Sequence, residues 1–77
     1  MARRLTGPQF LALGYLAVLG KATPKDLPMN PGTARRVLSG LTRRGYATKD
    51  SGSFAATPEG LTALAAAREQ ARREAGI

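Results

Sequence analysis

The clearest hydrophobic pattern of the chain lies in residues 31–44. Four apolar residues recur there at the i, i+3, i+4, i+7 spacing, which places them on one stripe of a helix. They are Ala34, Val37, Leu38 and Leu41. At about 100° per residue, Arg36 and Arg43 fall nearly opposite this stripe. The pattern therefore predicts an amphipathic helix with one face for a core and a basic face for a partner.

An earlier helix is predicted from the capping box Thr6-Gly7-Pro8-Gln9, in which side chains at both ends satisfy free backbone donors. It should run to about Leu19, because Gly20 suits the left-handed position after a helix end. Leu5 and Phe10 are spaced to form a hydrophobic staple across its start. The expected core face of this helix comprises Phe10, Leu13, Leu16 and Leu19, with Val18 alongside.

Between these two helices, Thr23-Pro24-Lys25-Asp26 gives another helix start, with an acid in the first turn. Pro28 disfavours helical geometry at Leu27, so this helix should be short. The amphipathic helix itself opens with Asn30-Pro31 and closes at Gly45.

The periodicity changes after Gly45. Residues 46–49 and 53–56 read as two short strands joined by the turn-forming cluster Asp50-Ser51-Gly52. Thr57-Pro58-Glu59 then begins a last helix, whose first apolar residues are Leu61, Leu64 and Ala65. Its second half is rich in alanine, arginine and glutamate, and Glu69 is spaced to pair with Arg72 or Arg73.

These elements predict one domain over residues 1–77, mainly α with a small β-hairpin, in the order helix, short helix, helix, hairpin, helix. A chain of 77 residues has room for one modest core. The formal charge of +7, from 12 Lys+Arg against 5 Asp+Glu, indicates a polyanionic partner. Charge alone leaves DNA, RNA and anionic membranes open.

The sequence offers little for catalysis. Cysteine and histidine are absent, which removes thiol and imidazole chemistry and the usual zinc sites. The acidic residues are scattered along the chain, with no pair that has a reason to converge: Asp26, Asp50, Glu59, Glu69 and Glu74. We therefore expect no enzyme activity, cofactor or metal, and no small-molecule ligand is evident.

The longest apolar stretch, residues 10–19, is about half the length of a bilayer span. We read it as a buried helix rather than a membrane segment. Although Arg3 and Arg4 precede an apolar run, Gly7 and Pro8 interrupt the pattern of a signal peptide. The expected location is therefore the cytoplasm, in association with the nucleoid.

The run Leu41-Thr42-Arg43-Arg44-Gly45-Tyr46-Ala47, followed by the hairpin and by Thr57-Pro58-Glu59-Gly60-Leu61, resembles the winged helix-turn-helix superfamily. Within it the chain is similar to small bacterial regulators of the MarR and PadR type, over nearly its whole length. The resemblance implies that residues 31–44 form the recognition helix, that the hairpin is the wing, and that a Thr-x-x-Gly turn starts the C-terminal helix. The chain lacks the long dimerisation helices of MarR-type proteins and its wing is short, so their dimerisation mode and ligand response are not carried over.

Ten residues are candidate DNA contacts. Arg36 and Arg43 are best placed, because a guanidinium makes two hydrogen bonds to guanine or clamps a phosphate; the alternative is that they are solvated charges. Arg35 and Arg44 lie on the flanks of the helix, which favours phosphate contacts. Lys49 is the one basic residue of the wing. The full set is Asn30, Gly32, Thr33, Arg35, Arg36, Ser39, Gly40, Arg43, Arg44 and Lys49.

Several of these candidates have a structural explanation as well. Gly32, Ser39 and Gly40 would let the helix backbone approach bases, but Gly40 would equally make room for a neighbouring helix. Asn30 and Thr33 stand at the helix start, where a phosphate can bind, although Asn30 is also the expected N-cap.

Residues outside the helix likewise have more than one interpretation. An arm with Arg3 and Arg4 would enter a minor groove or merely aid solubility. The basic stripe late in the last helix would contact the DNA backbone or be solvated: Arg68, Arg72 and Arg73. The aromatic residues Phe10, Tyr46 and Phe54 are expected in the core rather than on a stacking platform.

The leading hypothesis is a double-stranded DNA-binding protein that acts in transcription regulation. Alternatives are a winged-helix protein-interaction module, a viral or recombination accessory protein that bends DNA, and an RNA-binding protein, for which no stacking pattern appears. The last helix is expected to support a homodimer, because its small residues allow close helix approach: Ala63, Ala66, Ala67 and Ala71.

Overall fold

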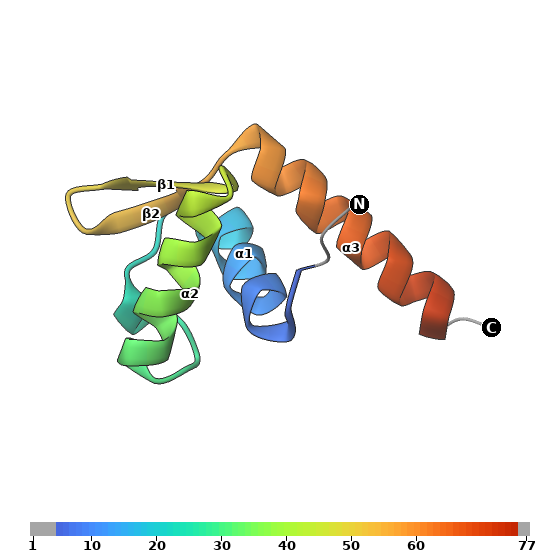
Figure 1. Cartoon of the computed structure of the whole chain (residues 1–77), viewed down its shortest axis with the longest axis horizontal. Coiled ribbons are helices and arrows are strands. Elements are labelled where there is room, and N and C mark those ends of the chain that lie inside the picture. The colour runs from blue at the N-terminus through green and yellow to red at the C-terminus, as the bar shows by residue number, and fades with distance from the viewer. Residues whose placement is uncertain (1–4, 76–77) are drawn as a thin grey trace.

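A computed structural model of the chain describes residues 5–75 (Figure 1). It contains three α-helices, a 3-10 turn and an antiparallel hairpin, so the predicted mainly helical fold with a small hairpin is confirmed. The elements are α1 (Gly7–Leu19), η1 (Pro24–Asp26), α2 (Pro31–Arg43), β1 (Ala47–Asp50), β2 (Ser53–Ala56) and α3 (Pro58–Ala75). The arm with Arg3 and Arg4 lies outside the described residues.

The helix starts form through local hydrogen bonds, as the sequence predicts. At α1 the Gln9 amide donates to the Thr6 hydroxyl (3.3 Å), and the Thr6 amide donates to Gln9 Oε1 (3.2 Å). At α2 the Gly32 amide donates to Asn30 Oδ1 (2.8 Å), which confirms Asn30 as the N-cap. Each bond joins residues two or three positions apart, so tertiary packing is not needed to form it.

The short second helix is a single 3-10 turn of three residues. Asp26 Oδ2 accepts hydrogen bonds from the Thr23 amide (2.9 Å) and the Thr23 hydroxyl (3.1 Å), which closes the turn. Leu27 adopts an extended backbone with φ −92° and ψ 146°, as a residue before proline favours, and the helix ends there. The buried Leu27 side chain anchors the turn to the core.

The hairpin differs from prediction at its tip. Asp50 is paired with Ser53, so it belongs to β1, and the turn contains only Ser51 and Gly52. Both turn residues have positive φ (52° and 86°), which matches a type I′ turn and the twist of the flanking strands. Including Asp50 in the turn was therefore wrong, and so was beginning the strand at Tyr46, one residue before β1.

A further strand-like segment joins the hairpin. Ala22, between α1 and η1, donates its amide to the Phe54 carbonyl (2.9 Å) and accepts from the Phe54 amide (2.8 Å). This single antiparallel bridge ties the linker after α1 to the edge of β2. The sequence did not predict it, because one paired residue leaves no alternating pattern.

The core lies where α1, α2 and the hairpin meet. It consists of Ala12, Leu13, Leu16, Ala22, Leu27, Ala34, Leu38, Leu41, Ala47, Phe54 and Leu64. Phe10 and Tyr46 are half-buried against it, while Phe54 is fully inside. The inward stripe of α2 and the central residues of α1 are thus as predicted.

The prediction for the end of α1 was wrong. Val18 is 79% exposed and Leu19 is 52% exposed, so neither belongs to the core. Val18 lies about 200° around the helix from the buried Leu16, and Leu19 is the last residue of α1. In α3 likewise, Leu64 is buried but Leu61 remains nearly half exposed.

The molecule is elongated, with extents of 41 × 23 × 22 Å. Figure 1 shows why: α3 runs past the body formed by α1, α2 and the hairpin, and its second half projects from it. Residues 68–74 of this half are all exposed. Within residues 5–75, no helix combines the length and the apolar character that crossing a bilayer demands.

Candidate nucleic-acid interface

The outer face of α2 is a continuous polar strip. Four of its exposed residues follow one another at spacings of four, three and four, so they share one side of the helix. We call them the outer strip: Gly32, Arg36, Ser39 and Arg43. On the opposite side Ala34, Leu38 and Leu41 are each 0% exposed. Packing of these three residues in the core fixes the rotation of α2 about its own axis. The outer strip therefore faces away from the core.

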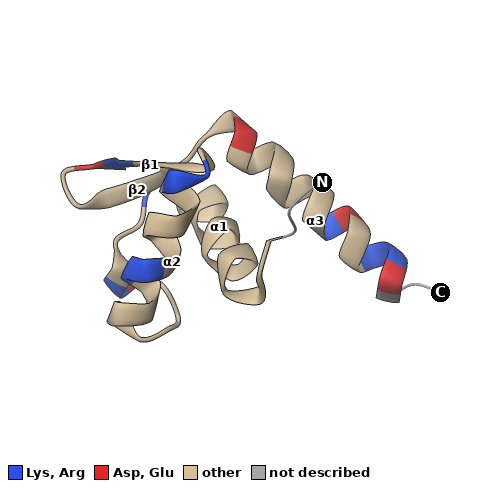
Figure 2. Cartoon of the chain, in the orientation of Figure 1, with Lys and Arg blue, Asp and Glu red and all other residues tan. Residues whose placement is uncertain are grey.

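The strip is cationic, without opposing charge. The sequence of α2 contains no aspartate or glutamate, and the acidic segments lie on other elements (Figure 2). Within residues 5–75, Arg35, Arg36 and Arg43 form no ion pair with a carboxylate. A local excess of positive charge of this kind attracts a polyanion and is not neutralised by the chain itself.

Two predicted contacts, Gly40 and Arg44, lie on another side of α2. A Cβ on Gly40 would be 3.5 Å from Gln9 Nε2, so this glycine faces the start of α1. Arg44 Nη1 donates to Gln9 Oε1 (3.0 Å), and its guanidinium carbon lies 4.8 Å from the centroid of the Tyr46 ring. Gly40 therefore fits its alternative interpretation, as room for a neighbouring helix, and Arg44 links the end of α2 to the start of α1.

The hairpin side of the strip contains a shallow groove of about 320 Å³ between α2 and the hairpin. Ser39, Thr42, Arg43, Lys49 and Phe54 line it. Lys49 Nζ stands 5.9 Å from the centroid of the Phe54 ring, which brings the one basic wing residue to the edge of the outer strip. We call this groove the cationic notch, since its two charged side chains are an arginine and a lysine.

Sequence reasoning missed Thr42 as a lining residue of the notch. Its hydroxyl donates to the Leu38 carbonyl within the helix (2.9 Å), so the notch offers a phosphate Arg43, Lys49 and the Ser39 hydroxyl as donors. A Thr side chain that bonds four residues back is common in helices, and only the tertiary position of the hairpin distinguishes it.

At the start of α2, Asn30 and Thr33 are exposed, beside the outer strip. The Asn30 side-chain oxygen is engaged in capping, as described above. Pro31 has no amide proton, and the Gly32 and Ala34 amides donate to Asn30, so the Thr33 amide is the one backbone donor of this turn left without a hydrogen bond among residues 5–75, at the positive dipole end of the helix. The two residues thus remain positioned for a phosphate contact at one end of the strip.

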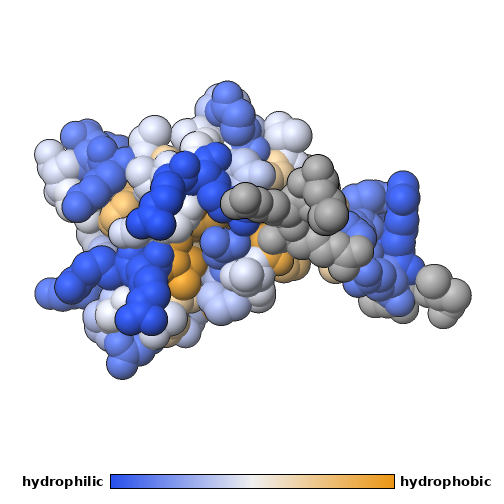
Figure 3. All heavy atoms as spheres, in the orientation of Figure 1, coloured by the Kyte–Doolittle hydropathy of each residue, from blue (hydrophilic) through white to orange (hydrophobic). Residues whose placement is uncertain are grey.

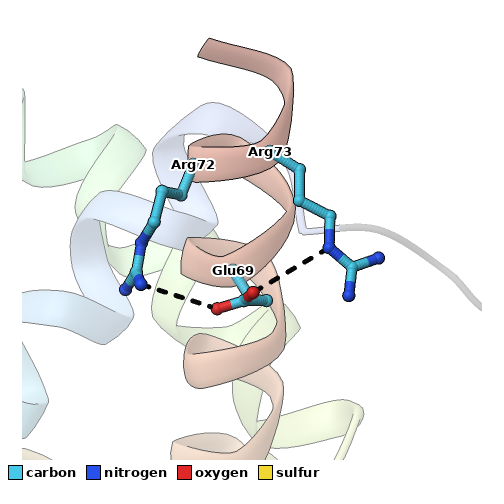
Figure 4. A network of polar contacts seen from close by, with 3 residues as sticks. All are labelled: Glu69, Arg72 and Arg73. Carbon is cyan, nitrogen blue, oxygen red and sulfur yellow. Dashed lines mark ion pairs between the residues drawn. The ribbon is translucent and has the colours of Figure 1, made fainter. Parts of the chain in front are cut away.

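The basic residues of α3 form a different surface. Glu69 lies between Arg72 (3.9 Å) and Arg73 (3.8 Å), as Figure 4 shows, which confirms the predicted pairing. All three side chains are at least half exposed, so these ion pairs contribute little to stability. Figure 2 places this end of α3 on the far side of α1 from α2, so it is not part of the outer strip.

The site is thus an exposed, acid-free helix face, flanked by a hairpin that adds a lysine and by a capped helix start. Its ten predicted residues divide into eight around the outer strip and two, Gly40 and Arg44, on the α1 side. Comparison of the chain with protein-family models, with curated proteins and with solved structures gave no match.

Proposed function

We propose that the chain is a winged helix-turn-helix protein that binds double-stranded DNA and acts as a small transcription regulator. In this proposal α2 is the recognition helix in the major groove, and the hairpin is a wing against the sugar-phosphate backbone. The observation that carries the proposal is the outer strip, whose two arginines form no ion pair with a carboxylate of residues 5–75 and lie opposite the buried Ala34, Leu38 and Leu41.

The dimensions of the strip suit a major groove. Arg36 and Arg43 are seven residues apart, or about 10 Å along the helix axis, which is close to three base-pair steps. The major groove is about 12 Å wide and accepts an α-helix. The small residues Gly32 and Ser39 on the same strip allow the backbone to approach the base edges.

The order of elements also supports the proposal. After α1, the Ala22 bridge supplies a first strand position, η1 a short turn, α2 the recognition helix, and β1 and β2 the wing. Because Ala22 pairs with Phe54 at the edge of β2, the hairpin is held at a fixed position beside α2. This placement favours Lys49 and Arg43 as joint contacts to one phosphate in the cationic notch.

Arg36 and Arg43 are the residues to test first. Arg36→Ala and Arg43→Ala should each weaken duplex binding, and a base-reading arginine should lose about 1–3 kcal/mol of discrimination at one position. Both side chains are exposed, so the free energy of unfolding should change by no more than about 0.5 kcal/mol. The melting temperature should therefore stay near that of the parent. Selection from a random duplex library, followed by titration on the selected and scrambled sites, measures both effects.

Arg72→Ala is the matched control for these variants, because it removes the same charge from the exposed far end of α3. It should leave the selected sequence unchanged. If Arg36→Ala and Arg43→Ala both bind DNA like the parent, α2 is not the recognition helix. If the parent binds no duplex even at low salt, the protein-interaction alternative replaces the proposal.

Arg35 should behave as a phosphate contact rather than a base reader, because it lies on the flank of α2 beside the outer strip. We expect Arg35→Ala to weaken binding to all duplexes by the same factor. The slope of log affinity against log salt should become shallower by about one unit, since one fewer counterion is released. Titrations of selected and scrambled duplexes at several salt concentrations check this, and a loss confined to one base position would contradict it.

A further inference from the structure

A broad concavity lies on a side of α1 that the proposed DNA site does not use. It is an apolar groove of about 810 Å³ beside α3, which we call the α1 groove. Its main lining residues are Phe10, Leu11, Tyr15, Val18, Leu19 and Arg68. Leu11 is 44% exposed, and Val18 and Leu19 are more so. In a domain whose core contains few large side chains, so much exposed aliphatic surface indicates a docking site.

The inward face of α3 continues beyond the part that packs on its own chain. Leu64, Ala67 and Ala71 follow one another at helical spacing, and they are buried, half-buried and exposed in that order. The same face that contacts the body near Leu64 is therefore uncovered at Ala71, on the projecting half seen in Figure 1. Small side chains there let another helix approach closely.

We propose that the α1 groove is covered by a second copy of this chain, with the projecting half of α3 from each copy lying in the α1 groove of the other. Such an arrangement is two-fold symmetric, so the groove and the helix that fills it occur on every copy and the contact closes at two subunits. Both halves of the interface are present on the described chain. This refines the predicted dimer: α1 supplies half of the surface, and Ala66 lies outside it.

Charge permits a second copy at this surface and disfavours one at α2. Two α2 faces would repel each other, since α2 has arginines and no acid. The projecting half of α3 instead mixes Glu69 and Glu74 with arginines. Arg68 stands at the rim of the α1 groove and forms no ion pair with a carboxylate of residues 5–75. A glutamate from the partner's α3 would be complementary to it.

The arrangement also leaves the proposed DNA site free. In Figure 1 α2 and α3 lie on opposite sides of α1, so covering the groove does not cover the outer strip. Figure 3 shows apolar surface in the middle of the molecule and a hydrophilic far end of α3. The area involved is small, and small interfaces belong to weak or transient association. We expect a dissociation constant on the order of 10 μM.

Sedimentation velocity of the whole chain without DNA tests whether the α1 groove is part of a dimer contact. The parent should pass from monomer to dimer across a concentration range centred on about 10 μM. The double variant Leu11→Gln/Val18→Gln should raise the dissociation constant at least tenfold, because it places amides in the apolar contact. Ala17→Gln is the control: Ala17 is exposed on α1 but does not line the groove, so its dissociation constant should equal that of the parent.

A second pair of variants tests whether the projecting half of α3 is the segment that fills the α1 groove. Ala71→Gln should weaken the dimer, whereas Ala66→Gln, about 140° away around α3, should not. Gln is a good helix former, and circular dichroism should show every variant folded. A parent that stays monomeric at about 200 μM overturns the proposal, as does an Ala71→Gln dimer equal to the parent. Because no DNA is present, these results are independent of the DNA titrations.

Discussion

Leu38→Ala is expected to destabilise the fold by about 2–5 kcal/mol, the usual range for a leucine truncated to alanine in a core. Leu38 is 0% exposed and lies on the inward face of α2, among the largest fully buried side chains of the chain. A domain of 77 residues has a total stability of about 4–12 kcal/mol. This one change should therefore remove a large part of it. Urea denaturation followed by circular dichroism gives the difference directly.

The control for Leu38→Ala is the same chemical change at an exposed position. Leu61 is 46% exposed, so Leu61→Ala should cost about 1 kcal/mol or less. Loss of DNA binding by Leu38→Ala should follow the fraction unfolded, and binding should return at a temperature where the variant is folded. Equal costs at the two positions would contradict the packing of α2 on α1.

Gly60→Ala should also destabilise the fold, by a somewhat smaller amount and for a different reason. A Cβ at Gly60 would meet the Tyr46 carbonyl at 2.1 Å and its carbon at 2.9 Å, and both atoms belong to backbone that no side-chain rotation can move. Alanine is ordinarily the better helix residue by about 1 kcal/mol. The steric conflict should outweigh this gain, and we expect a net destabilisation of about 1–3 kcal/mol, measured by thermal and urea unfolding.

The hydrogen bonds around Gly60 explain why the backbone cannot give way. The Thr57 hydroxyl donates to the Gly45 carbonyl (2.7 Å) and accepts from the Gly60 amide (3.0 Å), while the Thr57 amide donates to the Tyr46 carbonyl (3.0 Å). Gly7→Ala is the matched control, since a Cβ there meets nothing within 4 Å. That variant should be neutral or stabilised by up to about 1 kcal/mol. A neutral Gly60→Ala would show that α3 begins farther from Tyr46.

Most residues of the candidate site could be predicted from the sequence because they lie on one helix. The 100° advance per residue fixes which side chains lie opposite the apolar stripe, so Arg36, Ser39 and Arg43 could be assigned to one face in advance. Gly40 and Arg44 could not be assigned in this way. Whether they face solvent depends on Gln9 of another helix, 35 residues from Arg44.

The hairpin, too, could be predicted only in part from the sequence. Its existence followed from the turn-forming residues Ser51 and Gly52, but its position beside α2 depends on the bridge between Ala22 and Phe54. Neither residue carries a sign of that pairing in the sequence. The cationic notch exists only because the bridge and the core hold Lys49 close to Arg43.

By itself the sequence determined the helix boundaries, the two faces of α2 and the absence of cysteine and histidine chemistry. These depend on composition or on bonds between residues two to four apart, such as Thr6 with Gln9 and Asn30 with Gly32. Tertiary structure alone decided that Val18 is exposed, that Gly60 tolerates no side chain, and that α3 projects past the body. Those outcomes depend on which surfaces cover one another, and contacts between distant segments leave no local pattern.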